Sequence, residues 1–277
     1  MNFKVIFNFF GTILIILSIF MLAPILVSII YRSTDFGALV VSFLITIFSG
    51  SVMLALTKHY KYEEIMHKEA FIIVTLSWLI VVFFGSIPYI LTGSVNSFTD
   101  AFFESMSGFT TTGASIFADI ESLPTGLLFW RSMTQWIGGM GIIVFALAVL
   151  PLIGTGGMHL FKAEVPEISV DKLKPRIIDT AKALWFIYGG ITLLLVILYI
   201  FAGMDFYDAV CHAFTTISTG GFSTKNSSIA HFNNPVLEYV VSIGMFLGGI
   251  NFALYFYFIR GNFKVFFKSA EFKFYFF

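Results

Sequence analysis

Six long apolar runs, separated by shorter polar segments, set the pattern of the chain. They cover residues 7–30, 36–57, 70–92, 127–150, 183–204 and 236–259. A helix needs about 20 apolar residues to cross the hydrocarbon core of a bilayer. Backbone polar groups find no water in that core, so runs of this length must be helices. The pattern therefore predicts an all-α integral membrane protein with six spans.

The composition supports a membrane protein and narrows the classes of function. Of the 277 residues, 58% are hydrophobic and 12% are charged, against roughly 25% charged in a soluble domain. The net charge is zero, so the charge balance indicates no nucleic-acid partner. The single cysteine, Cys211, excludes an intramolecular disulfide framework. The first apolar run is too long for a signal-peptide core, so we expect a retained helix.

The basic residues are distributed unevenly between the two sides that six alternating spans define. Thirteen of the 16 lie on one side, which the positive-inside rule identifies as cytoplasmic. These are Lys4, Lys58, Lys61, Lys68, Lys162, Lys172, Lys174, Arg176, Lys182, Arg260, Lys264, Lys268 and Lys273. The other side has only Arg32, Arg131 and Lys225. We therefore expect a cytoplasmic amino terminus, with cytoplasmic loops at 58–69, 155–182 and 260–274.

The two long outer connections, 93–126 and 205–235, contain an internal repeat. "DAFFESMSGFTTTGAS" (100–115) aligns with "DAVCHAFTTISTGGFS" (208–223) at an offset of 108. The identical pairs are Asp100 and Asp208, Ala101 and Ala209, Thr111 and Thr219, Gly113 and Gly221, and Ser115 and Ser223. Each copy precedes a span with a Gly-Gly pair, at 138–139 and at 248–249. The predicted unit is a span, a short re-entrant helix, a Thr/Gly loop and a second span. Internal repeats of such units are typical of transporters.

The chemistry of the two loops, 109–115 and 217–223, favours a cation. Their carbonyl and hydroxyl oxygens can replace the hydration shell of a potassium ion. Short helices are predicted at 99–108 and 207–216, and their partly negative carboxyl ends favour a cation in the same place. Neither loop has a formal charge. Irregular backbone at membrane depth is tolerated where it lines a water-filled cavity, and the loops are therefore predicted to line one.

Several motifs resemble a known family of membrane proteins. "SGFTTTGAS" (107–115) and "TTISTGGFS" (215–223) are similar to the first and second filter loops of the Trk/Ktr/HKT potassium transporters. "QWIGGMGIIVFALAVLPLIGTGGMHLFKAE" (135–164) and "GGINFALYFYFIRGNFK" (248–264) resemble the segments that follow those loops. The two spans before the first repeat resemble the Trk H-type branch.

The resemblance implies a potassium uptake subunit in the cytoplasmic membrane of a prokaryote, with symport as a family property. Four repeats would surround one pore, and a glycine in each filter, here Gly113 and Gly221, is associated with potassium selectivity. The implied filter residues are Thr110, Thr111, Thr112, Gly113, Ser218, Thr219, Gly220 and Gly221. The implied partners are membrane lipid, a cytoplasmic TrkA-like nucleotide-binding subunit, and a second copy of the full-length chain in a homodimer. No cofactor is implied beyond the potassium ion as substrate.

The resemblance also implies a division of the chain. Residues 1–60 would form two extra transmembrane helices, 61–165 the first pore repeat, 166–265 the second, and 266–277 the start of a third. Only two of four expected repeats are present, so we expect the amino-terminal half of a transporter. The alternative is a non-conducting truncated fragment or an assembly partner. The sequence offers no nucleophile–base pair or metal-ligand spacing to support an enzyme.

Some individual residues keep more than one interpretation. Glu104 could concentrate cations near the pore mouth or could cap local amides. Arg131 could extend toward the membrane surface or pair with an acidic residue. Asp100 and Asp208 are expected at helix starts.

The glycine motifs admit a structural and a functional interpretation. For Gly138, Gly139 and Gly141 we prefer close helix packing. The run "GTGGMH" (154–159) faintly resembles a phosphate-binding loop, but it follows a span and does not support nucleotide binding.

Overall fold

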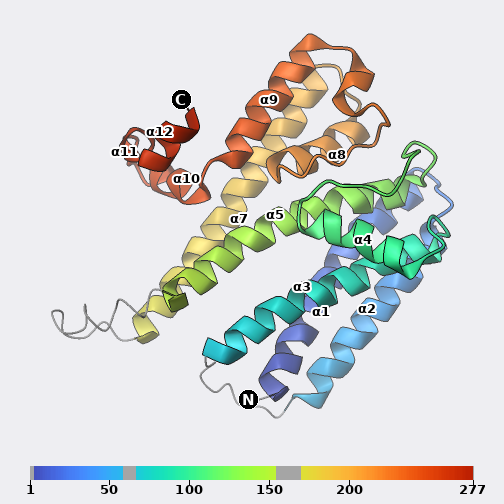
Figure 1. Ribbon diagram of the computed structural model, residues 1–277, viewed down its shortest axis with the longest axis horizontal. Coiled ribbons are helices and arrows are strands. Elements are labelled where there is room, and N and C mark those ends of the chain that lie inside the picture. The colour runs from blue at the N-terminus through green and yellow to red at the C-terminus, as the bar shows by residue number, and fades with distance from the viewer. Residues whose placement is uncertain (1–2, 59–66, 154–169, 277) are drawn as a thin grey trace. The chain divides into compact units, whose positions relative to one another are not determined.

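The computed structural model describes residues 3–58, 67–153 and 170–276, and in this part of the chain all regular structure is helical (Figure 1). The long helices are α1 (Phe3–Ile30), α2 (Phe36–Leu56), α3 (His67–Leu91), α5 (Thr125–Ile153) and α7 (Val170–Phe201). The shorter ones are α4 (Phe98–Phe109), α8 (Phe206–Ile217), η1 (Ser228–Phe232), α9 (Pro235–Gly249), α10 (Phe252–Ile259), α11 (Val265–Lys268) and α12 (Ala270–Phe276). The predicted all-α class is confirmed. The "GTGGMH" run lies outside the described residues.

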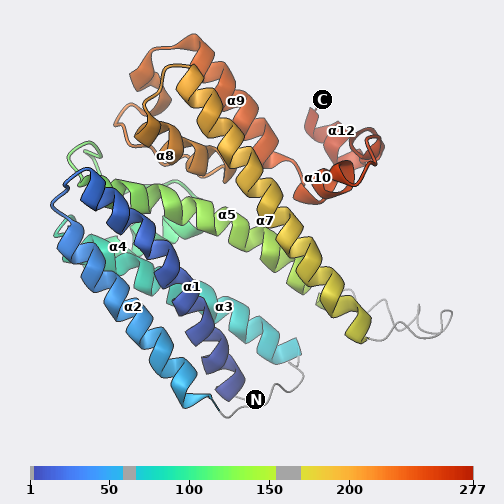
Figure 2. The same cartoon turned by 180° about the vertical axis from the view of Figure 1, so that it is seen from behind.

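The chain forms two compact units. The first consists of residues 1–135 together with 222–231, and the second of residues 136–221 together with 232–277. Helix α5 therefore contributes to both units, and the segment after the second Thr/Gly loop belongs to the first. In the first unit α1, α2 and α3 pack side by side, and in the second α7, α8 and α9 do so (Figures 1 and 2).

Four described helices are long and apolar enough to cross a membrane: Phe3–Ile30, Phe36–Leu56, Phe71–Leu91 and Thr180–Phe201. They confirm four predicted spans, and the 29 residues of α5 cover the run 127–150. Helix α7 ends before the predicted residue 204. Gly203 has a φ of +96°, its N–H donates to Ile200, and the N–H of Met204 donates to Tyr199. This hydrogen-bond pattern around a left-handed glycine terminates a helix.

The last predicted span, 236–259, is wrong as a single helix. Helices α9 and α10 meet at a bend of 88°. At the break, the side chain of Asn251 accepts a hydrogen bond from the N–H of Ala253 at 3.0 Å and so caps α10. A side-chain acceptor of this kind offers the backbone an alternative to continuing the previous helix. The apolar run alone could not reveal the break, because all its remaining residues suit a span.

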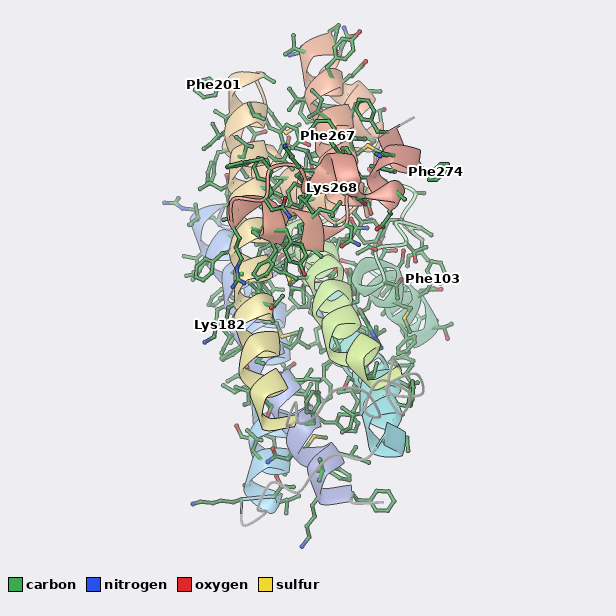
Figure 3. The ribbon with its side chains drawn as sticks, turned by 90° about the vertical axis from the view of Figure 1, so that its left-hand side faces the viewer. Phe103, Lys182, Phe201, Phe267, Lys268 and Phe274 are labelled. Atoms are coloured by element: carbon green, nitrogen blue, oxygen red, sulfur yellow. The ribbon has the colours of Figure 1, made fainter. Side chains whose placement is uncertain are left out.

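Small residues allow the first two helices to cross closely. A Cβ atom at Gly11 would lie 3.0 Å from the carbonyl oxygen of Gly50, and one at Gly50 would lie 3.1 Å from that of Gly11. Such contacts are typical of helix packing in membranes, where no hydrophobic force drives helices together. Large apolar side chains instead cover the outer surface, as Phe103, Phe201 and Phe274 illustrate in Figure 3.

Helices α4 and α8 lie where the two short helices were predicted, with each end within one residue of the expectation. Twelve residues give a length of about 18 Å, well short of the roughly 30 Å hydrocarbon core. Their N-cap residues, Ser97 and Asp205, are again 108 positions apart. Asp205 accepts hydrogen bonds from the N–H groups of Tyr207 and Asp208. Asp100 and Asp208 occupy the first turn, as expected at a helix start.

Candidate functional site

The two Thr/Gly loops have the same backbone conformation. Thr111 has a φ of 56° and Thr219 a φ of 53°, and the glycines two positions later, Gly113 and Gly221, have φ of 77° and 79°. A positive φ is uncommon outside glycine, and for a β-branched residue it is a genuine outlier. The same outlier at equivalent positions means that the 108-residue repeat extends from sequence to backbone geometry.

The hydrogen bonds that end the two short helices also repeat. Backbone N–H groups bond Thr110 to Met106, Thr111 to Gly108 and Thr112 to Ser107 in the first copy, and Ser218 to Phe214, Thr219 to Thr216 and Gly220 to Thr215 in the second. Both sets form the helix ending in which a left-handed residue redirects the chain. That residue is usually glycine, but here it is threonine in both copies.

These bonds determine which carbonyl oxygens remain available. In the described chain, no backbone amide donates to the carbonyl oxygens of residues 110–113 or 218–221. The threonine hydroxyls are more engaged. The Thr110 Oγ1 donates to the carbonyl of Met106 and lies 2.8 Å from the Thr112 Oγ1, and the Thr219 Oγ1 donates to the carbonyl of Ser218. Apart from the Ser218 carbonyl, which accepts from the Thr219 hydroxyl, the backbone carbonyls therefore make fewer hydrogen bonds than the threonine hydroxyls.

Open space surrounds the glycine of the second loop. A Cβ atom at Gly221 would meet no other atom within 4 Å, and the residue is exposed. The positive φ alone therefore favours glycine there.

Two glycines pack closely against the carboxyl end of α8. A Cβ at Gly139 of α5 would lie 2.7 Å from the Tyr188 hydroxyl and 2.9 Å from the Ser218 Cβ. A Cβ at Gly248 of α9 would lie 2.6 Å from the carbonyl oxygen of Ile217. Of the three glycines Gly138, Gly139 and Gly141, the packing interpretation is confirmed at Gly139. These close contacts fix the position of the start of the second loop.

Helix α4 is anchored by hydrogen bonds to its neighbours. The Ser105 hydroxyl donates to the carbonyl of Val82 in α3 at 2.8 Å. The Trp130 indole of α5 donates to the carbonyl of Gly85 in α3 and packs edge-to-face on Phe109, the last residue of α4. The carboxyl end of α4, from which the first loop departs, is therefore held on two sides.

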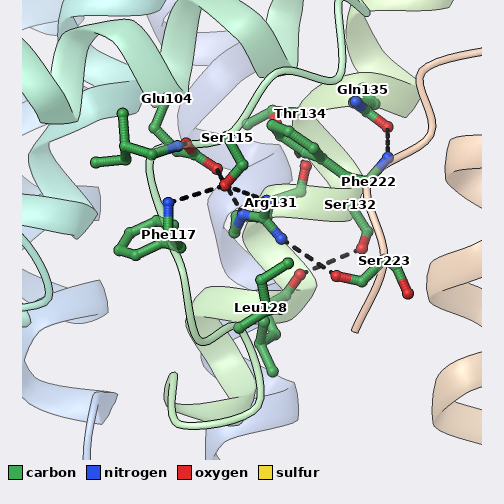
Figure 4. A network of polar contacts seen from close by, with 12 residues as sticks. Glu104, Ser115, Phe117, Leu128, Arg131, Ser132, Thr134, Gln135, Phe222 and Ser223 are labelled. Atoms are coloured by element: carbon green, nitrogen blue, oxygen red, sulfur yellow. Dashed lines mark hydrogen bonds and ion pairs between the residues drawn. The ribbon is translucent and has the colours of Figure 1, made fainter. Parts of the chain in front are cut away.

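A buried ion pair lies beside the first loop (Figure 4). The Arg131 Nε donates to the Glu104 Oε1 at 2.8 Å, and the two side chains are 1% and 0% exposed. The Glu104 carboxylate also accepts from the Ser115 hydroxyl and from the N–H of Ile116, both at 3.0 Å. For Glu104 the capping interpretation is thus confirmed, and Arg131 is buried and pairs with an acidic residue.

Arg131 also contacts the segment that follows the second loop. Its Nη1 donates to the carbonyl of Ser223 at 3.2 Å, and its guanidinium lies 4.0 Å from the centre of the Phe222 ring. One helical turn further along α5, the Gln135 Oε1 accepts from the N–H of Phe222 at 3.0 Å (Figure 4). Sequence analysis did not identify Gln135. The four-residue spacing from Arg131, which places both on one helix face, was the available signal.

A second polar cluster joins the same two segments near the surface. The Asn226 side chain donates to the Asp119 carboxylate at 2.8 Å and accepts from the N–H of Ile120. The N–H of Asn226 donates to Glu121 at 3.0 Å. The hydrogen bond from Asn226 holds the pKa of the Asp119 carboxyl below its usual value. This cluster ties residues 119–121 to residue 226 independently of Arg131.

The start of α5 is capped from the turn between α1 and α2. Asp35 is 2% exposed, and it accepts from the Ser28 hydroxyl at 2.6 Å and from the N–H of Leu127 at 2.7 Å. The Ser33 hydroxyl accepts from the N–H of Thr125. Free amides at a helix start need acceptors, so the two amino-terminal helices help to fix the helix that carries Arg131 and Gln135.

Comparison with known proteins gives one family. The chain matches TrkH, described as a cation transport protein, over residues 37–277. It is 42% identical over 276 residues to the Trk system potassium uptake protein TrkH of Escherichia coli strain K12, covering 99% of this chain and 57% of that protein. It is 35% identical over 275 residues to the Trk system potassium uptake protein TrkG of the same strain, covering 98% and 56%.

The fold agrees with the sequence comparison. The crystal structure of the potassium transporter TrkH from Vibrio parahaemolyticus is similar with a TM-score of 0.85 and 36% identity, over 99% of this chain and 56% of that one. The chain spans about half the length of the curated relatives that it matches. The family match covers most of the chain, and the chain belongs to the TrkH family of cation transport proteins.

Proposed function

We propose that the two Thr/Gly loops line the path of a potassium ion through a membrane transporter. Residues 110–113 and 218–221 supply the carbonyl oxygens, with Gly113 and Gly221 giving each loop its turn. The observation that carries the proposal is the shared backbone, with left-handed threonines and glycines at the same positions of both copies. Strained backbone of this kind persists where the surroundings fix it and is concentrated at functional sites.

The electrostatics of the loops suit a monovalent cation. Each loop follows the carboxyl end of a 12-residue helix, where the partial charge of the aligned peptide dipoles is negative. Neutral oxygens replace the ion's hydration shell without binding it too tightly to leave. The relatives named as potassium uptake proteins favour potassium as the ion for this chain.

Two loops supply about half of the oxygens that surround an ion in a four-loop filter. We therefore propose that this segment acts within a pore of four repeats, two of them formed by residues 61–165 and 166–265. The half-length coverage of the relatives is consistent with this arrangement.

The setting follows from the distribution of charge and from the family. We propose a cytoplasmic membrane with the amino terminus inside, since 13 of the 16 basic residues fall on one side of the predicted spans. A TrkA-like cytoplasmic regulatory subunit, symport and a homodimer of the full-length chain are further parts of the proposal. A cysteine at position 61, in a Cys211→Ser background, should resist an impermeant thiol reagent applied from outside, whereas one at position 227 should react.

Rubidium uptake tests the function directly. The complete reading frame that carries these residues is expressed in a strain without other potassium uptake systems, and rubidium and sodium uptake are compared. Growth on limiting potassium with sodium-discriminating rubidium uptake supports the proposal. A chain that reaches the membrane in normal amount but takes up no rubidium favours the alternative, a non-conducting fragment or assembly partner.

The 277 residues expressed alone provide a separate test of the four-repeat arrangement. A half-coordinated ion in an apolar setting stays badly desolvated, so we expect no potassium-selective flux from liposomes that contain only this segment. Sodium-discriminating flux would instead require a pore built from two copies of it.

A further inference from the structure

We infer that Arg131, fixed by Glu104, is a positioning residue that sets discrimination between potassium and sodium. It does so by holding in one geometry the exits of both Thr/Gly loops, which are the residues that directly follow the loop glycines, 114–115 and 222–223. The inference rests on the proposed function and assigns a role to residues outside the loops themselves. Neither residue offers an oxygen or charge to the ion, since their charges cancel and both side chains are buried.

The first step is the symmetry of the contacts on the guanidinium. Ser115 and Ser223 are equivalent in the 108-residue repeat, each two positions after the loop glycine. The Arg131 Nη2 donates to the Ser115 Oγ at 3.1 Å, and the Nη1 donates to the Ser223 carbonyl at 3.2 Å. One planar group therefore bonds the exit of each loop (Figure 4).

The second step is the fixed shape of the group. A guanidinium has five N–H donors in one rigid plane, so the directions of its bonds are set relative to one another. The Nε bond to Glu104 fixes the plane, and the aromatic ring of Phe222 lies over it at 4.0 Å. A lysine in the same place would keep the charge but lose these fixed directions.

The third step concerns what the ion pair contributes. A buried pair gives little net stability compared with well-packed apolar residues, because desolvating two charges offsets their attraction. Such a pair is better suited to fixing one geometry of its neighbours than to adding stability. Glu104 itself bonds Ser115 and the N–H of Ile116, so the whole network acts on the loop exits.

Gln135 supplies an independent clamp on the second exit. Its Oε1 accepts from the N–H of Phe222, the residue directly after Gly221. Gln135 is fully buried and uncharged. A change at this position perturbs the same exit without leaving a buried charge unpaired.

The experiment compares Arg131→Lys with Gln135→Met and with the control Arg32→Lys, which changes an exposed arginine in a turn. Membrane abundance, rubidium uptake and the rubidium-to-sodium uptake ratio are measured for the complete reading frame. We expect Arg131→Lys to lower the ratio while rubidium uptake continues, because loops held less rigidly no longer keep their carbonyl oxygens in the geometry that suits potassium. Gln135→Met should lower it in the same direction, and Arg32→Lys should leave it unchanged.

The outcomes separate this inference from the proposed function. No rubidium uptake by the unsubstituted chain contradicts the proposed function. Selective uptake by the unsubstituted chain and an unchanged ratio in Arg131→Lys, at normal abundance, overturns the role of Arg131. If Arg131→Lys fails to accumulate in the membrane, Gln135→Met decides: a lowered ratio supports the positioning of the loop exits, and an unchanged ratio overturns it.

Discussion

Thr111 and Thr219, 108 positions apart, share a left-handed backbone conformation with φ of 56° and 53°. Each follows the last turn of a 12-residue helix and makes the same hydrogen bond, from its N–H to the carbonyl three residues back. L-residues other than glycine pay about 1–2 kcal/mol for this conformation. The structure therefore contains the same local strain twice, at the point where each loop leaves its helix.

The strain predicts an unusual response to glycine. Thr219→Gly should leave the thermal stability of the purified protein unchanged or raise it by up to about 1 kcal/mol, because glycine adopts a positive φ without a steric penalty. The matched control is Thr46→Gly in the middle of α2, which should destabilise by about 1 kcal/mol or more. Both variants are heated in detergent, and their stabilities are compared by the temperature at which the monodisperse peak is lost. Equal losses for both variants would show that Thr219 is not strained.

The cap of α8 predicts a dependence on pH. Burial and the neighbouring carboxyl side chain of Asp208 raise the pKa of the Asp205 carboxyl above its usual value, and they outweigh the opposite effect of the backbone N–H groups that Asp205 caps. The folded state thus binds this proton more tightly, and the resulting stabilisation is present below the usual pKa and lost as the pH rises through the raised one. Asp205→Asn should remove this dependence while keeping the cap, since asparagine is an equally good N-cap residue.

Alanine at the same position separates the cap from the charge. Asp205→Ala should cost about 1 kcal/mol at neutral pH, because two amides of the first turn lose their acceptor. Thermal stability of both variants is measured from acidic to neutral pH. A loss in Asp205→Asn as large as that in Asp205→Ala would mean that the charge, and not the cap, matters.

The capping of α5 by Asp35 predicts that the amino-terminal helices stabilise the first repeat. Asp35→Ala removes the buried acceptor of the Leu127 N–H and leaves the Ser28 hydroxyl with its longer, 3.4 Å hydrogen bond to the Ser33 carbonyl. Each unsatisfied buried group costs about 1–3 kcal/mol, so the thermal stability should fall clearly. Asp35→Asn keeps one acceptor oxygen and should lose less. The prediction fails if the alanine and asparagine variants are both as stable as the unsubstituted protein.

Sequence patterns predicted much of the fold because long apolar runs leave the backbone few alternatives in a membrane. The four spans and the two short helices followed from hydropathy and from the repeat. The break between α9 and α10 did not, because the Asn251 cap that begins α10 is a single polar residue within a largely apolar run.

The candidate site was only partly predictable, and the reason lies in sequence separation. The loop residues could be predicted because the repeat aligns two continuous segments of the sequence, 100–115 and 208–223. The contacts of Arg131 with Glu104 and Ser223 join positions 27 and 92 residues apart. An arginine near the end of a span permits several partners, and only tertiary packing selects among them.

Serine substitution of the loop glycines tests the central claim that both loops line the ion path. Gly113→Ser and Gly221→Ser are compared with Gly93→Ser. Gly93 has a similar positive φ of 69° and, like Gly221, open surroundings, but it lies outside the loops. The rubidium-to-sodium uptake ratio of the complete reading frame is measured at matched membrane abundance. The account predicts a reduced ratio in both loop variants and an unchanged ratio in Gly93→Ser, because an added side chain redirects carbonyls that replace the potassium hydration shell. A ratio unchanged in both loop variants would contradict it.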